Sequence, residues 1–221
     1  GMKHIKGISS PFFEIYYFCL AAFLAIIYTY PLIINPTTMF YGFKWDSLAG
    51  IWFFWWLKFS YIHGLPLKIF TYLAYPFGCD FSSNPFSYVL NFIAFLLTYF
   101  TNEIAAYNIL KLISFPMLAL TTHLLVHYLT EDRIVSAIIG LVYAFSPFHV
   151  IHNMAHFANV YWTPLVILFL LKLLKEGGYK NGVLFGLFFG LTFVDYAYYA
   201  YFIGLLTPVF VIAYLLNKDK R

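Results

Sequence analysis

Long, almost uncharged apolar stretches recur along this chain, and they limit its fold more than any other feature of the sequence. Five regions are apolar enough to be read as membrane-spanning: residues 11–34, 104–130, 134–148, 158–174 and 182–216. A spanning helix needs about 20 predominantly apolar residues. The last region is too long for one span at about 1.5 Å per residue. We therefore predict that it forms two helices, which turn around residues 195–199.

The composition excludes a water-soluble domain. Of the 221 residues, 62% are hydrophobic and 10% are charged, whereas soluble domains carry about 25% charged residues. The cations that give the net charge of +4 are dispersed along the chain, so we expect no nucleic-acid partner. Two cysteines are too few for a disulfide framework. We expect an all-α integral membrane protein with a single transmembrane domain, residues 1–221.

Two further apolar segments decide the topology. Residues 47–62 are rich in tryptophan, which favours a helix lying in the membrane interface. Residues 85–100 either cross the membrane or re-enter on the same side. Cytoplasmic loops are enriched in Lys and Arg. The basic residues all lie on the cytoplasmic face only if residues 85–100 do not cross the membrane. These residues are Lys3, Lys6, Arg133, Lys172, Lys175, Lys180, Lys218, Lys220 and Arg221.

This reasoning predicts a multi-pass protein of the cell membrane with about six transmembrane helices. Residues 1–10 form a cytoplasmic N-terminus and residues 217–221 a cytoplasmic tail. A large first external loop, residues 35–103, contains the interfacial or re-entrant helices.

Most remaining ionisable residues fall on the external side of this predicted topology. Lys111 lies about 10 Å inside the second span, where a charged group costs at least about 2.5 kcal/mol and indicates function by default. The alternative is that its side chain snorkels to the headgroups. Asp46 precedes the tryptophan-rich segment, and its spacing alone favours a helix N-cap over a catalytic role.

The histidines form two groups. His149, His152 and His156 are spaced so that a helix would present them on one face. Imidazole is the commonest metal ligand, but the glutamate of the zinc-protease motif is missing, so we expect polar contacts and no metal. His123 and His127 lie four residues apart in the second span. Haem ligands usually face each other from different helices, so we expect these two to pack in the bundle.

Several motifs together resemble the GT-C superfamily of membrane glycosyltransferases. Trp45-Asp46-Ser47 with the aromatic run at residues 51–56 is similar to the start of the long first external loop of that superfamily, and residues 75–78 resemble its middle. The second-loop region of many prokaryotic members resembles residues 144–148, His152, His156 and residues 162–165, and Tyr198-Tyr199 resembles a further recurrent pair. The resemblance covers nearly the whole chain.

The resemblance implies transfer of a sugar from a polyprenyl-phosphate-linked donor on the non-cytoplasmic face. Asp46 would be the general base, and Lys111 or Lys68 would stabilise the phosphate leaving group. The other residues expected to bind the sugar or the lipid phosphate are Asp80, Trp52, His152, His156, Asp195 and Tyr198. We expect no cofactor and no metal, because the second loop lacks the acidic pair of oligosaccharyltransferase catalytic subunits.

The partners implied by this resemblance are the lipid-linked sugar and membrane lipid. Members of the superfamily are usually longer. We therefore expect this chain to be the N-terminal conserved membrane module, completed by a partner subunit or a missing C-terminal region.

Two other classes of function remain open. A lipid-linked-sugar carrier or assembly subunit would show polar groups at the bilayer midplane and internal repeats, whereas this chain gathers its polar residues toward one face. A haem- or metal-binding electron-transfer subunit would rest on His123 and His127.

Overall fold

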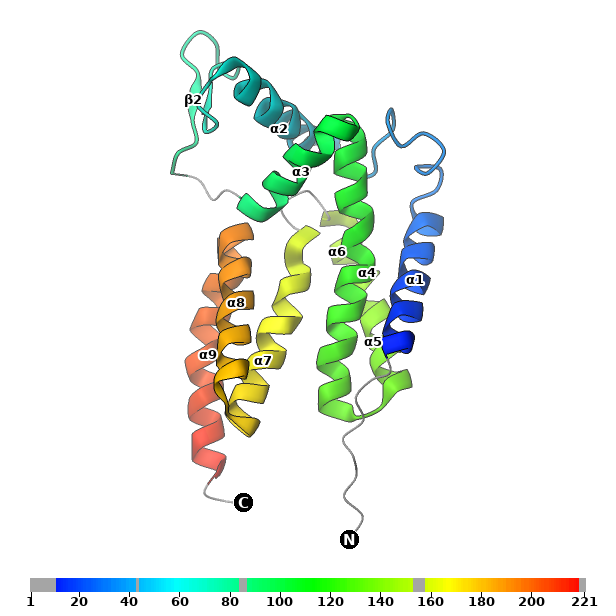
Figure 1. Cartoon of the computed structure of the whole chain (residues 1–221), viewed down its shortest axis with the longest axis vertical. Helices are drawn as coiled ribbons and strands as arrows, with labels where there is room; N and C mark the ends of the chain where they lie inside the picture. The colour runs from blue at the N-terminus through cyan, green and yellow to red at the C-terminus, as the bar shows by residue number, and fades with distance from the viewer. Residues whose placement is uncertain (1–10, 43, 84–86, 153–157, 219–221) are drawn as a thin grey trace.

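The chain forms a helical bundle with a separate helical layer across one end (Figure 1). The computed structural model describes residues 11–42, 44–83, 87–152 and 158–218, and is 77% helical. The helices that stand side by side are α1 (Pro11–Tyr28), α4 (Glu103–Thr130), α5 (Arg133–Ala144), α7 (Trp162–Glu176), α8 (Tyr179–Asp195) and α9 (Ala197–Lys218).

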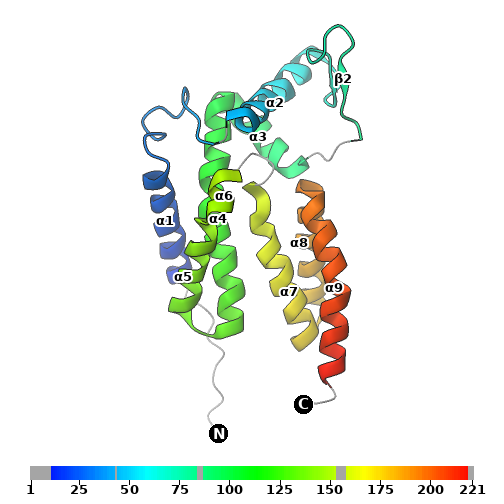
Figure 2. The same ribbon diagram turned by 180° about the vertical axis from the view of Figure 1, so that it is seen from behind.

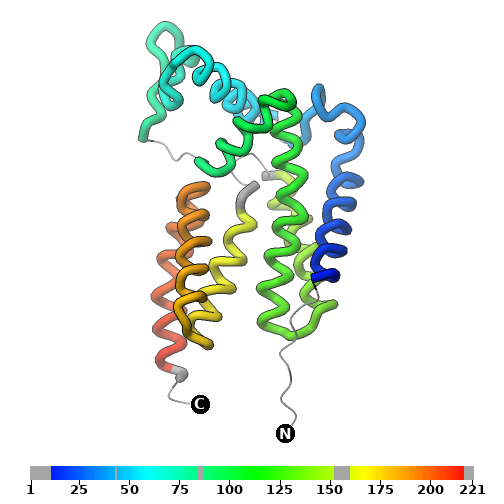
Figure 3. Tube along the Cα trace, in the orientation of Figure 1, coloured from blue at the N-terminus to red at the C-terminus, as the bar shows by residue number. Residues whose placement is uncertain are grey.

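One end of the bundle, which we call the loop end, is covered by a layer of two helices and a hairpin (Figure 2). Its elements are α2 (Lys44–His63), α3 (Tyr88–Phe100) and the antiparallel strands β1 (Ile69–Phe70) and β2 (Cys79–Asp80). Between α5 and α7 the chain forms a short helix, α6 (Pro147–His152), and a 3₁₀ turn, η1 (Ala158–Tyr161). The tube in Figure 3 shows that α1 begins and α9 ends at the opposite end of the bundle.

Four helical segments in the described part of the chain are long and apolar enough to cross a membrane: α1, α4, the α5–α6 stretch (Arg133–Ile151) and α9. This agrees with the prediction of an all-α membrane protein. Helices α7 and α8 have only 15 and 17 residues, although they stand in the bundle beside the others. Helix α3 has 13 residues and lies across the loop end, not along the bundle.

Prolines explain where the helices differ from the apolar stretches. The predicted span 11–34 contains α1, which ends at Tyr28, because Pro31 has no N–H donor and disfavours helix in the residue before it. The stretch 134–148 breaks after Ala144, and α6 begins at Pro147, a residue well suited to the first helical position. The predicted turn at residues 195–199 is confirmed, since α8 ends at Asp195 and α9 begins at Ala197.

Helix α4 is the centre of the fold and packs against α1, α5 and α7 along the bundle and against α2 and α3 at the loop end. Its contact with α5 is close because Gly140 has no side chain. A Cβ there would lie 2.6 Å from the Ala119 carbonyl oxygen and would meet the Tyr17 hydroxyl. The Tyr17 hydroxyl donates to the Ala137 carbonyl at 2.7 Å, so α1 is bound to the same junction.

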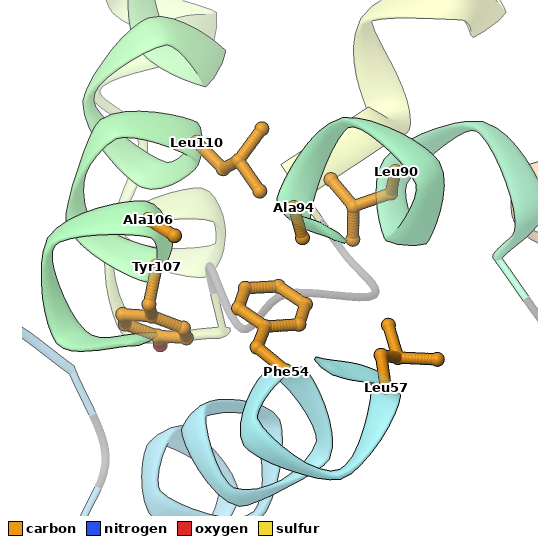
Figure 4. Packing of buried hydrophobic residues seen from close by; sticks show 7 residues of the cluster. All are labelled: Phe54, Leu57, Leu90, Ala94, Ala106, Tyr107 and Leu110. Carbon is orange, nitrogen blue, oxygen red and sulfur yellow. The ribbon is translucent and has the colours of Figure 1, made fainter. Parts of the chain in front are cut away.

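A hydrophobic cluster fixes the loop-end layer to α4 (Figure 4). Phe54 and Leu57 of α2 are buried against α3 and α4. The other members of the cluster are Leu90, Ala94, Ala106, Tyr107 and Leu110. Each large apolar side chain buried in this way contributes about 1.5–3 kcal/mol.

Two asparagines of α4 bind the segment that follows α1. The Asn102 side chain caps the start of α4 by accepting from the Ala105 N–H, and donates to the Thr37 carbonyl, both at 2.8 Å. Asn108 donates to the carbonyls of Pro36 and Met39 at 2.8 and 2.7 Å. These bonds hold the end of the segment, residues 41 and 42, against α4.

Candidate functional site

Polar groups from distant parts of the chain meet around Lys111 near the loop end of α4. The residue lies about 12 Å along the helix from Glu103, and its side chain is 3% exposed. The ammonium nitrogen lies 5.2 Å from the ring centre of Tyr41 and 5.7 Å from that of Tyr107, within the range of cation–π attraction. A snorkelling lysine keeps its charged tip in water or headgroups, which this burial does not allow.

Gly42 closes one side of this arrangement. Its φ of +138° is a conformation that side-chain-bearing residues rarely adopt. A Cβ at this position would lie 2.5 Å from Ser47 Oγ and 2.7 Å from Lys111 Nζ. A side chain at this position would therefore collide with Ser47 and with the Lys111 amine, so the site requires glycine here. We call the group formed by Tyr41, Gly42, Ser47, Tyr107, Lys111, Ser114 and His149 the Lys111 site.

Helix α2 brings Asp46 next to the site. The Tyr107 hydroxyl donates to Ser47 Oγ at 2.9 Å, and Asp46 directly precedes Ser47 in the first turn of α2. Helix α2 begins at Lys44, so Asp46 lies inside its first turn and the N-cap interpretation is wrong. An acidic residue in the first turn is stabilised by the helix dipole.

His149 of α6 lies on the other side of the lysine. It is 4% exposed, and its Nε2 lies 3.4 Å from Ser114 Oγ, a hydroxyl that also donates to the Lys111 carbonyl at 2.7 Å. His149 belongs to the spaced histidine group of the sequence, of which the family resemblance implies a substrate-binding role only for His152 and His156. The side chain of His152 and the whole of His156 lie outside the described residues.

A small cavity adjoins the Lys111 site on the His149 side. Its volume is about 120 Å³, and almost all of its accessible wall is apolar, which disfavours water and suits a small apolar group. It is lined by Leu118, Tyr143, Ser146, Phe148, His149, Val160 and Tyr199.

Asp195, which the resemblance assigns to substrate binding, joins three parts of the fold. It is 2% exposed, and its Oδ1 accepts from the N–H groups of Val89 and Leu90 at 2.9 and 3.2 Å. Its Oδ2 accepts from Trp162 Nε1 at 3.1 Å. The carboxylate thus caps the N-terminus of α3 from the α8–α9 turn, a favourable place for negative charge. These contacts give Asp195 a structural role.

The four remaining predicted residues make their described contacts elsewhere. Lys68 donates to the Tyr88 hydroxyl at 2.9 Å. Trp52 stacks on Trp56 with ring centres 5.9 Å apart. Asp80 is exposed, and hydrogen bonds from the hydroxyl and N–H of Ser82 hold the pKa of its carboxyl below the usual range. Tyr198 is exposed and packs against Tyr196.

The histidines of α4 lie within the bundle. His123 is fully buried, with Nδ1 2.9 Å from Ser136 Oγ, and its ring stacks on that of His127. Two parallel rings on one helix do not face each other across a haem. Over the described ranges, no group of three or more His, Cys, Asp or Glu residues is placed to hold a metal ion.

Comparison with protein-family models, with curated proteins and with solved structures found no match. The fold and the site therefore define the structural class of this protein and not its family. This is an all-helical membrane protein with a buried cationic site at the end of the bundle that carries α2 and α3.

Proposed function

We propose that this chain is the membrane core of a glycosyltransferase that uses a polyprenyl-phosphate-linked sugar donor. The observation that supports the proposal is the Lys111 site, where the buried Lys111 amine and Ser47 both lie against Gly42, and Ser47 directly follows Asp46 in the first turn of α2. A lysine binds phosphate as a point charge, and a nearby carboxylate can accept a proton from an attacking hydroxyl. A base for the acceptor hydroxyl and a cation for the leaving phosphate would both accelerate glycosyl transfer from a lipid phosphate.

The proposed reaction is a displacement at the anomeric carbon of the donor sugar. The acceptor hydroxyl attacks this carbon, its proton passes to the Asp46 carboxylate, and the bond from the anomeric carbon to the phosphate oxygen breaks. The lipid phosphate leaves with the bonding electrons, and Lys111 stabilises its added negative charge. The Tyr107–Ser47 hydrogen bond and the packing of Ser47 and Lys111 around Gly42 connect the turn of α2 that bears Asp46 to the part of α4 that bears Lys111.

Removing the ammonium group should weaken binding of the lipid phosphate. We expect Lys111→Met to lower affinity for polyprenyl phosphate by roughly 10- to 100-fold, the equivalent of one charge-assisted hydrogen bond. Binding would be measured by mass spectrometry of the purified protein titrated with the lipid. Lys180→Met, which removes an exposed lysine from the other end of the bundle, is the matched control. Equal affinity of the two variants would remove Lys111 from the phosphate site.

The proposed topology has six spans, with α7 and α8 crossing and α3 not crossing. It is supported by the bundle, in which α1 begins, α9 ends and the α7–α8 turn lies at the end opposite α2 and α3. That end carries Lys172, Lys175 and Lys180, and cytoplasmic loops are enriched in such residues. The loop end is then non-cytoplasmic.

Cysteine labelling in intact cells tests this topology, on a background in which Cys19 and Cys79 are replaced. Phe77 and Tyr179 are matched positions, 94% and 89% exposed at opposite ends of the protein. An impermeant thiol reagent should label the Phe77→Cys variant and not the Tyr179→Cys variant. Labelling of the Tyr179→Cys variant would refute the six-span arrangement.

A further inference from the structure

Two lysines meet one tyrosine at the end of the bundle opposite the loop end, where α4 and α7 finish (Figure 1). The ammonium nitrogens of Lys172 and Lys175 each lie 5.3 Å from the ring centre of Tyr128, within the range of cation–π attraction. The two lysines are three residues apart on α7 and so share one face of that helix. Two positive charges are therefore gathered around a single aromatic ring of α4.

A carboxylate close to these lysines does not pair with them. Glu176, the last residue of α7, accepts a hydrogen bond from the Tyr128 hydroxyl at 2.9 Å. In the part of the chain that the structure describes, the recorded contacts of the two lysines are with aromatic rings and not with a carboxylate. We call Tyr128, Lys172, Lys175 and Glu176 the Tyr128 group. Its two cations and one anion leave it with surplus positive charge.

The depth of the Tyr128 group indicates which ligand can reach it. Tyr128 lies two residues before the end of α4, a helix long and apolar enough to cross a membrane. Tyrosine is enriched where spans meet the lipid headgroups, and lysines near a helix end extend their charged tips to the same level. Lys175 is exposed and Lys172 is half-buried, so both remain accessible from the headgroup layer. A lysine binds phosphate as a point charge.

We propose that the Tyr128 group binds the phosphate of an anionic phospholipid at the level where α4 and α7 leave the membrane. The phosphate lies between the two ammonium groups, and the acyl chains run along the bundle into the same leaflet. The surplus positive charge favours a lipid of net negative charge over a zwitterionic one, whose own ammonium group the lysines repel. This site lies at the opposite end of α4 from Lys111 and does not depend on the proposed glycosyl transfer.

Native mass spectrometry of the purified protein tests this, with phosphatidylglycerol and phosphatidylcholine of the same acyl chains as probes. Wild type should bind phosphatidylglycerol about fivefold more tightly, the effect of one unit charge at a membrane surface. Replacing both lysines, Lys172→Gln with Lys175→Gln, should lower its affinity by roughly 10- to 25-fold and remove the preference. Arg133→Gln with Lys180→Gln removes the same charge at the same end of the bundle and should keep the preference.

Glu176→Gln should have the opposite effect. Glutamine can still accept from the Tyr128 hydroxyl but carries no charge, so this variant should bind phosphatidylglycerol about fivefold more tightly than wild type. A damaged fold would not strengthen binding. Equal binding of the two lipids by wild type, an equal loss in the Arg133–Lys180 control, or no gain in Glu176→Gln would each overturn the proposal. Displacement of phosphatidylglycerol by excess glycerol 3-phosphate would contradict it too, because the site would then bind a soluble phosphate.

Discussion

Replacing Asp46 by Asn should slow glycosyl transfer by about 10²–10⁴-fold, the usual contribution of a general base. Asparagine has nearly the same shape but cannot accept the proton of the acceptor hydroxyl. Asp46 lies in the first turn of α2, where loss of its charge–dipole interaction costs only about 0.3–1 kcal/mol. Helix α2 should therefore remain folded, and Ser47 should still accept from Tyr107.

Transfer would be measured in membranes of cells in which the variant replaces the wild-type chain, using a labelled polyprenyl-phosphate-linked sugar. Glu103→Gln is the control, because Glu103 is likewise an acidic residue in the first turn of a helix that begins at the loop end, and it should transfer normally. Near-normal turnover of Asp46→Asn would show that Asp46 only stabilises the helix. Lipid binding by wild type without any transfer would instead favour the carrier or assembly subunit.

Asp195→Ala should lower the free energy of unfolding by roughly 3 kcal/mol or more. The substitution leaves one buried and two part-buried donors without this acceptor: the N–H of Leu90, the N–H of Val89 and the indole N–H of Trp162. Each unsatisfied donor costs about 1–3 kcal/mol. Because these bonds connect α3, η1–α7 and the α8–α9 turn, the loop-end layer should loosen first. Unfolding in detergent, followed by heat or denaturant, measures the loss.

Asp195→Asn separates the hydrogen bonds from the charge. Its carbonyl oxygen can still accept from the two N–H groups of α3, while its amide nitrogen faces the Trp162 N–H and forms no bond with it. This variant should lose less stability than Asp195→Ala, because fewer donors are orphaned. An Asp195→Ala protein as stable as wild type would contradict the structural role and reopen a contact with substrate.

The sequence alone predicts the bundle well, because spanning helices follow from hydropathy and length. The turn near Asp195 was also predictable, because a charged residue interrupts a long apolar stretch. Hydropathy does not register that Pro31 ends the first helix. Hydropathy also does not show the break before Pro147. The predicted ends of these two spans, residues 34 and 148, therefore differ from the helix ends at Tyr28 and Ala144.

The candidate site was predictable only in part. Lys111 is conspicuous as a charge inside an apolar segment, but Gly42 and Ser47 lie far from it in the chain. No local pattern indicates that they meet. The partners of Asp195 are equally distant, 105 and 106 residues away for the two N–H groups of α3. His149 was passed over because spacing treats three histidines alike, whereas burial distinguishes them.

The asparagines that fasten the segment after α1 have a consequence for sequence divergence. Asn102 and Asn108 donate to main-chain carbonyls of Thr37, Pro36 and Met39. Every amino acid carries such a carbonyl. The side chains of residues 36, 37 and 39 can therefore differ among related sequences without loss of these bonds, provided that the two asparagines remain. The position of Gly42 beside the ammonium group is thus specified from α4, by residues more than 50 positions away in the chain.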